Sequence, residues 1–308
     1  MAGRAAIVAT ARHSIARGSR SFALASRLFD SVTRERAWLL YSWCRRCDDL
    51  IDGQDHGHDM RAVADPLARV AMVERLTAAA LAGEAGGEAA FEALRIVAAE
   101  TALPPRFAHD LVAGFRLDAE DWRPRSEDDL YRYCYHVAGA VGCMMAVVMG
   151  VAPEDRDTLD RACDLGMAFQ LANIARDVAE DDRVGRCYLP LEWLAEMDIP
   201  PGEHMKPPFR ARLTVLVRRL TDRAALHEAS ARVGAARLPP RSRWAVLAAA
   251  GIYGDIARKV AQRGGHAWNG RVSIGMAAKL ARVARAGIDA LGARADAPRA
   301  PALWTRPG

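Results

Sequence analysis

The stretch Arg45-Arg46-Cys47-Asp48-Asp49-Leu50-Ile51-Asp52 ends an apolar run that begins at Ala37 and has the pattern of a helix. Residues four apart lie on one face of a helix, so Asp48 and Asp52 project side by side, with Arg45 one turn earlier. Carboxylates at this spacing repel each other, and acidic groups at the carboxyl end of a helix also oppose its dipole. A solvated helix end could carry these charges, whereas a bound divalent cation would explain why both penalties are tolerated.

A second acidic stretch ends a helix predicted over residues 154–182. At about 100° per residue, one narrow stripe of this helix carries four polar side chains: Gln170, Asn173, Asp177 and Asp181. The helix begins apolar, so the first two of them lie in a core segment, where polar groups need partners. Oxygen ligands with an arginine such as Arg176 nearby suit Mg²⁺ that bridges to the phosphates of a substrate. A diphosphate neutralised in this way becomes a good leaving group.

Loss of a diphosphate leaves a carbocation, which requires a water-excluded pocket lined by apolar and aromatic groups. Residues 133–152 form an uncharged stretch of twenty residues that includes Tyr133 and several small residues. This length could span a bilayer. The stretch is only moderately hydrophobic, however, which favours a helix buried inside a helical domain and forming one wall of such a pocket.

Composition favours helices and a sizeable core. The chain has 308 residues, of which 51% are apolar, and runs of β-branched residues are scarce. The net charge of +5 and the pI near 9.0 are mildly basic. Because the basic residues are scattered and no nucleic-acid motif is present, we expect no nucleic-acid partner and only a weak preference for anionic ligands or membrane surfaces.

The six cysteines do not resemble a secreted disulfide framework in a chain of this length. Cys44 and Cys47 form a C-x-x-C pair that lacks a second pair at metal-ligand spacing. We interpret them as structural residues of a helix, and we expect the protein in the reducing cytoplasm.

Helical periodicity runs nearly from end to end and is interrupted by turn residues rather than by strands. The predicted helices cover residues 4–16, 22–29, 33–51, 64–82, 87–101, 105–120, 127–149, 154–182, 208–234, 240–263 and 273–292. No repeat or long linker divides the chain. The sequence therefore predicts one all-α domain over residues 1–308, with residues from about 293 to 308 forming a tail rich in Pro, Ala and Arg.

The two acidic stretches belong to a set of four motifs that stand in order along the chain. They are Arg45…Asp48-x-x-x-Asp52, Tyr133-Cys-Tyr-His-Val-Ala-Gly-x-Val-Gly142, Asn173-x-x-Arg-Asp177-x-x-Glu-Asp181 and Gly185-Arg-x-Tyr-Leu-Pro190. Together they resemble the squalene/phytoene synthase family of trans-isoprenyl diphosphate synthases, and within it the bacterial phytoene synthases. The resemblance extends from Gly18 to Tyr253 and on to Arg271, and it includes the closing Leu303-Trp304-x-Arg-Pro307.

The resemblance implies an isoprenoid-synthase-like helical bundle around a central prenyl-binding cavity. It implies the head-to-head condensation of two geranylgeranyl diphosphates, with Mg²⁺ (or Mn²⁺ as the alternative ion) and without NADPH. The product would be phytoene, formed through cyclopropyl prephytoene diphosphate with release of diphosphate, as the first committed step of carotenoid biosynthesis.

The resemblance also assigns roles to individual residues. Those expected to hold metal are Asp48, Asp52, Asn173, Asp177 and Asp181, the four aspartates also counting as catalytic. Those expected to contact diphosphate or the first prenyl carbons are Ser19, Arg20, Ser21, Tyr41, Arg45, Gln170, Arg176, Tyr253 and Arg271. Tyr133 and Tyr188 would stabilise cations or guide proton loss. Arg20 stands where relatives often have lysine, which keeps the charge but changes its geometry.

Two other readings remain open at this point. One is the C15 branch of the same family, a dehydrosqualene, squalene or hydroxysqualene synthase, because substrate length depends on the depth of the pocket. The other is a non-catalytic helical subunit that binds a prenyl lipid or a partner enzyme. The lipid nature of substrate and product also predicts peripheral contact with the inner face of the membrane and with enzymes of the carotenoid pathway.

Overall fold

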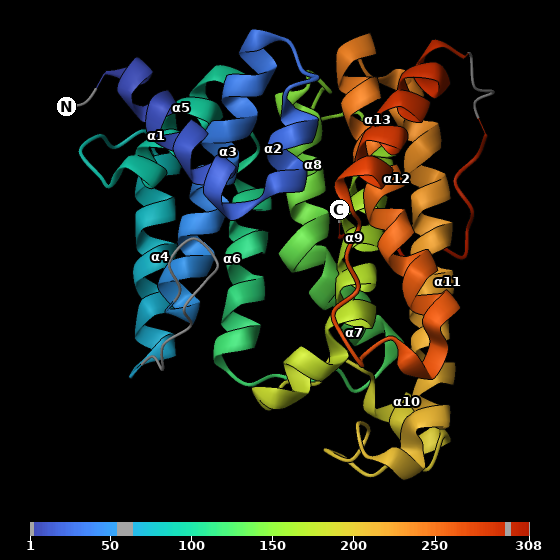
Figure 1. Cartoon of the computed structure of the whole chain (residues 1–308). Helices are drawn as coiled ribbons and strands as arrows, with labels where there is room; N and C mark the ends of the chain where they lie inside the picture. The colour runs from blue at the N-terminus through green and yellow to red at the C-terminus, as the bar shows by residue number, and fades with distance from the viewer. Residues whose placement is uncertain (1–2, 54–63, 293–296, 308) are drawn as a thin grey trace.

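The computed structural model describes residues 3–53, 64–292 and 297–307, and every regular element in these ranges is helical (Figure 1). The α-helices are α1 (Arg4–Gly18), α2 (Arg20–Ser26), α3 (Ser31–Asp52), α4 (Pro66–Leu81), α5 (Ala89–Thr101), α6 (Pro105–Ala119), α7 (Glu127–Cys134), α8 (Ala140–Val148), α9 (Arg156–Arg183), α10 (Leu191–Glu196), α11 (Arg210–Gly234), α12 (Pro240–Arg263) and α13 (Met276–Leu291). A π-helical turn, η1 (Tyr135–Gly139), joins α7 to α8, and short 3₁₀ turns lie at η2 (Pro207–Phe209), η3 (Ala235–Arg237) and η4 (Gly264–His266).

Local sequence explains where the two helices with acidic motifs begin. The Asp30 side chain accepts a hydrogen bond from the Thr33 amide at the start of α3, and Asp155 does the same for Thr158 at the start of α9. Such caps satisfy amide groups that have no partner within the helix. The left-handed Gly53 (φ 65°) then ends α3 directly after Asp52. The caps therefore set the ends of the helices that carry both acidic stretches.

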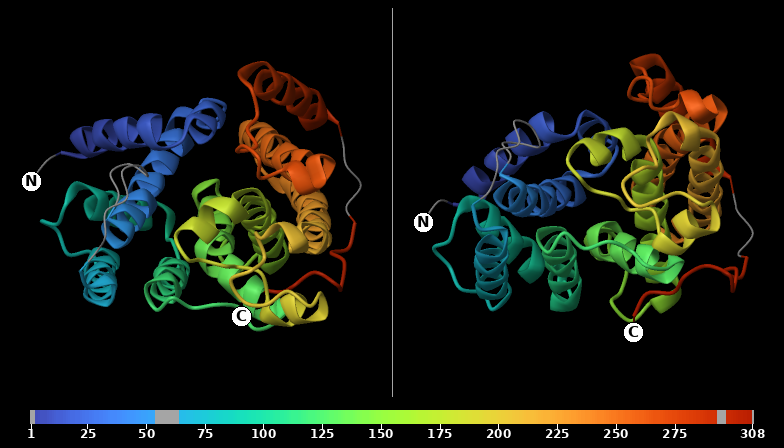
Figure 2. Two further views of the ribbon diagram at one scale, coloured as in Figure 1. Left: turned by 60° about the horizontal axis from the view of Figure 1, so that its bottom comes forward. Right: turned by 90° about the horizontal axis from the view of Figure 1, so that it is seen from below.

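Helix α9 lies at the centre of the bundle. It packs against α8, α11, α12 and η1. Figure 2 shows α1 to α6 on one side and α11 to α13 on the other, with α8 and α9 between them. One continuous apolar core runs from Ile7 to Ile274 and includes residues of both sides. The all-α fold predicted from the sequence is thereby confirmed.

Glycines let α9 approach the neighbouring helix closely. A Cβ atom added at Gly166 would lie 2.2 Å from the carbonyl oxygen of Ala138, and one added at Gly142 would lie 2.2 Å from that of Ala162. Both contacts are with backbone, which cannot rotate away as a side chain can. The close approach of α9 to η1 at Gly166 and to α8 at Gly142 therefore requires residues without a Cβ atom at these two positions.

The C-terminal tail lies against α9 and α7. Arg299 donates hydrogen bonds to Asp164 at 2.7 and 2.8 Å, Arg306 pairs with Asp160 at 2.7 Å, and the Trp304 indole donates to Asp128 at 2.8 Å. The predicted tail is thus an ordered strap over residues 297–307.

The predicted helices agree with the structure apart from a few differences. The segment predicted as one helix over 127–149 is interrupted by the π-helical turn η1, and α1 continues to Gly18. The sequence reading missed α10, which has six residues and follows Pro190. All six cysteines are free thiols. In the described part of the chain, no helix combines the length and the apolar character that crossing a membrane requires.

Candidate active site

An apolar cavity of about 270 Å³ lies among α2, α8, α9, α11 and α12. Its walls are mostly aliphatic and aromatic, including Phe22, Phe29, Val141, Met145 and Phe169. The small residues of the uncharged segment 133–152 form one wall, as expected, because Ala138, Val141, Gly142 and Ala146 line it. The cavity therefore offers a long-chain hydrocarbon a water-excluded surface.

Few polar side chains line this cavity. The predicted residues Gln170 and Asn173 of α9 and Tyr253 of α12 are among them. The Tyr253 ring stacks on Phe169 with ring centroids 4.0 Å apart. Burial raises the pKa of Tyr253 despite the opposing charges of Arg176 and Arg45. The charges of both guanidinium groups act on this one tyrosine, so the first and the second motif both lie toward this end of the cavity.

The first motif lies on the last turns of α3. The Arg45 guanidinium forms an ion pair with Asp48. Tyr41, one turn earlier, stacks on Phe22 with ring centroids 5.7 Å apart, and burial raises the pKa of its hydroxyl. A Cβ atom at Gly18 would lie 2.4 Å from the Tyr41 hydroxyl, which explains glycine at the end of α1. The structure therefore places Tyr41 and Arg45 side by side next to the cavity wall.

Ser19 holds the turn between α1 and α2, where its hydroxyl accepts a hydrogen bond from the Phe22 amide at 3.3 Å. The side chains of Arg20, Ser21 and Asp52 lie outside the described residues, although their backbone belongs to α2 and α3. The positions of these three predicted side chains stay predictions.

The second motif is rich in charge. The Arg176 Nε donates to Asp177 at 2.7 Å, and Arg271 reaches the same carboxylate from a distant segment at 3.3 Å. Arg271, which the sequence predicted as a diphosphate contact, therefore lies at the second motif. Burial, followed by the nearby charge of Asp177, raises the pKa of Asp181 to about 7. A carboxyl group in such surroundings would be stabilised in its charged form by a bound cation.

These acidic groups suit Mg²⁺ by the chemistry of their donor atoms, because all are carboxylate or amide oxygens. Within the described residues, no three His, Cys, Asp or Glu side chains are grouped as a ready-made metal site. The ion pairs give a physical reason, since Asp48 and Asp177 each face a guanidinium group. Such an arrangement suits an ion that binds together with phosphate oxygens better than one enclosed by protein ligands alone.

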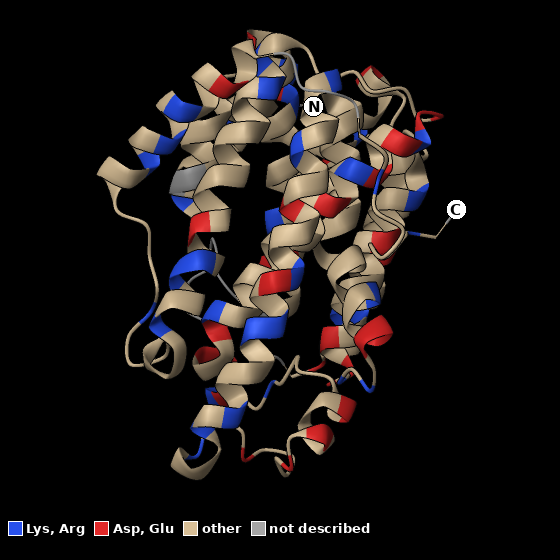
Figure 3. Ribbon diagram, turned by 90° about the vertical axis from the view of Figure 1, so that its right-hand side faces the viewer, with Lys and Arg blue, Asp and Glu red and all other residues tan. Residues whose placement is uncertain are grey.

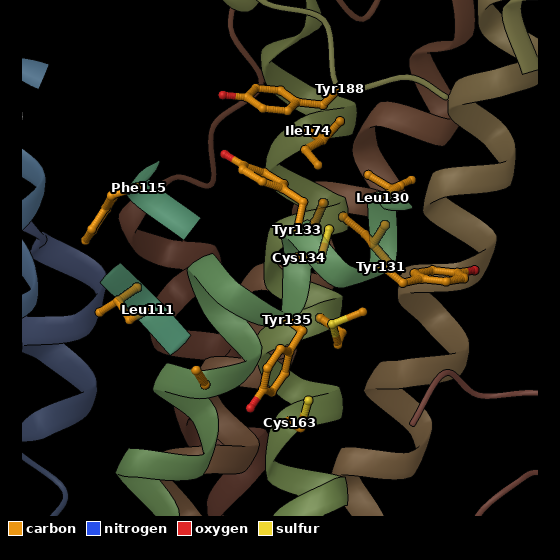
Figure 4. Packing of buried hydrophobic residues seen from close by; sticks show 14 of the residues in the cluster. Leu111, Phe115, Leu130, Tyr131, Tyr133, Cys134, Tyr135, Cys163, Ile174 and Tyr188 are labelled. Carbon is orange, nitrogen blue, oxygen red and sulfur yellow. The ribbon is translucent and has the colours of Figure 1, made fainter. Parts of the chain in front are cut away.

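Tyr133 and Tyr188 form a stacked pair whose ring centroids are 4.8 Å apart, and Trp122 stacks on Tyr133 from 5.9 Å. Figure 4 shows the two tyrosine rings nearly parallel, with both hydroxyls on the same side and Ile174 beside them. Tyr133 is 3% exposed and Tyr188 is 9% exposed. Neither lines the apolar cavity, which differs from the expectation that Tyr133 forms part of its wall.

Sequence reasoning missed Asp118, at the end of α6, which joins this tyrosine pair. Tyr133 donates to it at 3.1 Å and Tyr188 at 2.9 Å. Burial, followed by the charge of Asp118, raises the pKa of both tyrosines. A signal for Asp118 was present in the sequence, because it continues the apolar face of Phe107, Leu111 and Phe115 at helical spacing.

Comparison with known proteins agrees with these motifs. The family model described as squalene/phytoene synthase matches residues 15–296. The chain is 45% identical over 294 residues to 15-cis-phytoene synthase of Pantoea ananas, covering 94% of each chain. It is also 45% identical over 306 residues to 15-cis-phytoene synthase of a Paracoccus species, covering 98% of each chain.

Solved structures show the same fold. A dehydrosqualene synthase in complex with ligand aligns with a TM-score of 0.81 and 25% identity, covering 92% of this chain and 96% of that one. A squalene synthase of Alicyclobacillus acidocaldarius aligns with a TM-score of 0.72 over 85% of this chain and 95% of that one; at 24% identity, it supports the fold alone.

Proposed function

The chain belongs to the squalene/phytoene synthase family, and from this premise we propose that it condenses two geranylgeranyl diphosphates head to head to phytoene, with Mg²⁺ and without NADPH. The observation that carries the proposal is the near full-length identity of 45% to two proteins named 15-cis-phytoene synthase. This likeness favours a C20 substrate over the C15 substrate of the related branch.

The diphosphate groups would bind where the two motifs meet. Arg45, Arg176 and Arg271 lie there beside the carboxylates of Asp48 and Asp177. Guanidinium groups bind phosphate oxygens through several donors at once, so these three are suited to hold the leaving group. From the family motif, Ser19, Arg20, Ser21, Tyr41, Gln170 and Tyr253 complete the proposed binding set.

The proposed metal ligands are Asp48, Asp52, Asn173, Asp177 and Asp181. Mg²⁺ bound there would supply the positive charge that makes diphosphate a good leaving group. The chain itself then keeps water from the cation, because the adjoining cavity is apolar along most of its walls. Phe169 and Tyr253 present stacked aromatic rings at its polar end, where ring faces favour a cation.

We assign cation stabilisation or proton loss to the Tyr133–Tyr188 pair, held by Asp118. The raised pKa of both tyrosines keeps their hydroxyls protonated at neutral pH. Since both protons are donated to Asp118, this carboxylate fixes the orientation of the two phenols. The negative charge of Asp118, next to the two hydroxyls, favours a positive charge nearby.

We propose that the protein is cytoplasmic and makes reversible contact with the inner face of the membrane. The free thiols are typical of a reducing compartment. A C40 hydrocarbon needs an apolar phase to leave the enzyme, and the next enzymes of a carotenoid pathway would receive it there.

The test is incubation of the purified full-length chain with geranylgeranyl diphosphate and Mg²⁺ without NADPH, followed by mass analysis of the extract. We expect a C40 hydrocarbon with the mass of phytoene. Asp48→Ala and Asp177→Ala should each abolish product while keeping the far-UV circular dichroism of the wild type. Asp222→Ala, which removes a surface carboxylate that is 61% exposed, is the matched control and should keep full activity. Absence of a C40 product, or substantial activity in either motif variant, would overturn the proposal.

A further inference from the structure

Helix α13 is the outermost helix on its side of the bundle and packs on α12 (Figure 2). Its outward face is apolar, with four large side chains exposed to solvent: Met276 (56%), Leu280 (52%), Ile288 (65%) and Leu291 (89%). Ala277, Ala281 and Ala284 are also exposed and lie on the same side of the helix. We call these seven residues the α13 stripe. Its spacing follows one side of the helix over its whole length.

The stripe is bordered by positive charge. Helix α13 contains Lys279, Arg282 and Arg285 and a single acidic residue, Asp289, which is 20% exposed and pairs with Arg285. Arg282 pairs with Asp255 of α12. None of the fully exposed positions of α13 is acidic. On the side of the molecule seen in Figure 3, which is the side of α11 to α13 in Figure 1, Lys and Arg lie among Asp and Glu on most helices. Leu and Ile on one face of a helix with Lys and Arg beside them are typical of a helix that lies in the surface of an anionic bilayer.

The inner face of α13 lies close to the apolar end of the cavity. Ala286 and Val283 pack in one cluster with Leu247, Ala248 and Val246 of α12, and Val246 also lines the cavity. The cavity residues Leu238 and Ala245 belong to the neighbouring apolar cluster, into which Val246 also packs. Helix α12 therefore lies between the stripe and the part of the cavity lined by Leu238, Ala245 and Val246, which is the apolar end meant here. The charged motifs lie toward the end marked by Asn173 and Tyr253.

We propose that the α13 stripe docks the protein on an anionic lipid bilayer, with the apolar end of the cavity next to the lipid. The partner follows from the proposed function, on which this inference rests, because a C40 hydrocarbon product must pass into an apolar phase. The positive border of the stripe complements anionic headgroups. Docking on this face leaves the diphosphate end open to water, from which charged substrate arrives and into which diphosphate leaves.

The experiment is flotation of the full-length protein with vesicles of phosphatidylglycerol at low salt, and with phosphatidylcholine vesicles in parallel. The test variant is Leu280→Glu/Ile288→Glu, which places two negative charges on the stripe. The matched control is Val215→Glu/Leu226→Glu on α11, where the two side chains are 46% and 51% exposed. Neither pair touches the proposed binding machinery, and circular dichroism checks that both variants fold.

We expect wild type and control to float with phosphatidylglycerol vesicles, less so at high salt. The stripe variant should bind at least about tenfold more weakly. Wild-type protein that does not float, or equal binding by wild type and stripe variant, would overturn the inference. An equal loss of vesicle binding in the α11 control variant would also overturn it. So would light scattering that shows a dimer of the wild type which the stripe variant does not form.

Flotation needs no turnover, so its outcome is independent of the proposed activity. Production of a C40 hydrocarbon in detergent by wild type that does not float would refute docking alone. Stripe-dependent flotation of protein that makes no such product would refute the activity alone.

Discussion

Gly166→Ala tests whether the close approach of α9 to the π-helical turn η1 shapes the cavity. The added Cβ would lie 2.2 Å from the Ala138 carbonyl oxygen and 2.8 Å from the Gly139 Cα. Carbon and oxygen approach no closer than about 3.3 Å, so the two backbones must separate by roughly 1 Å. Gly166 and Ala138 both line the cavity, so this movement would change its width.

Two effects of opposite sign decide the stability of Gly166→Ala. Overpacking of a well-packed core costs about 1–3 kcal/mol. Replacing glycine by alanine inside a helix returns about 1 kcal/mol. Because both neighbours are backbone atoms that cannot rotate away, we expect a cost in the upper part of the range and a net loss of about 1–2 kcal/mol.

The matched control is Gly251→Ala, inside α12. There the nearest atoms to an added Cβ are the Arg282 Cδ at 3.3 Å and the Arg232 Nη2 at 3.6 Å, both far along flexible side chains. The higher helix propensity of alanine should therefore determine the stability of this variant. Its free energy of unfolding should equal that of the wild type or exceed it by up to about 1 kcal/mol. Urea unfolding followed by far-UV circular dichroism measures the stability of both variants. Initial rates at several substrate concentrations measure the effect of each substitution on KM. A Gly166→Ala protein as stable and active as wild type would refute the reasoning.

Two further predictions concern other parts of the structure. Asp164 is fully buried and accepts hydrogen bonds from Arg299, His227 and Ser230, which outweigh the effect of burial and lower its pKa. The charged carboxylate therefore stabilises the fold above the ordinary aspartate pKa, and this stabilisation is lost as the pH falls through the lowered value. Asp164→Asn should lower the free energy of unfolding by about 3–5 kcal/mol at pH 7. Below about pH 4 the loss should be smaller. Urea titrations at both pH values check this; a pH-independent cost would contradict it. Asp118→Asn should lower the rate of product formation more than it raises KM, because it disturbs the tyrosine pair and leaves the arginines in place; steady-state kinetics that show a change in KM alone would refute this.

The sequence predicted the helices that carry both acidic motifs because periodicity and caps are local properties. Asp30 and Asp155 mark the starts of α3 and α9, and Gly53 marks the end of α3. The π-helical turn η1 could not be predicted in this way, because it occurs where Gly139 meets Cys163 and Met167 of another helix. The order of the C-terminal strap has the same origin, since Arg299 and Asp164 are 135 residues apart.

In the proposed site too, local features could be predicted from the sequence, whereas contacts between distant segments could not. Gln170 and Asn173 were predicted to lie on one helical stripe within a core segment, and in the structure both line the cavity. The ion pair of Arg271 with Asp177 joins residues 94 positions apart, and the role of Asp118 depends on two tyrosines from other segments. Charged groups at helix ends look alike in a sequence whether they face solvent or a partner. Only the packing distinguishes Asp118 from its exposed neighbour Glu120.

The most direct test of the central claim is a competition between equal concentrations of geranylgeranyl and farnesyl diphosphate in one reaction with Mg²⁺ and without NADPH. The ratio of C40 to C30 products reports the ratio of kcat/KM values and so the chain length that the cavity selects. We predict that the C40 hydrocarbon with the mass of phytoene predominates. A predominance of C30 products would contradict the account and assign the protein to the C15 branch of its family.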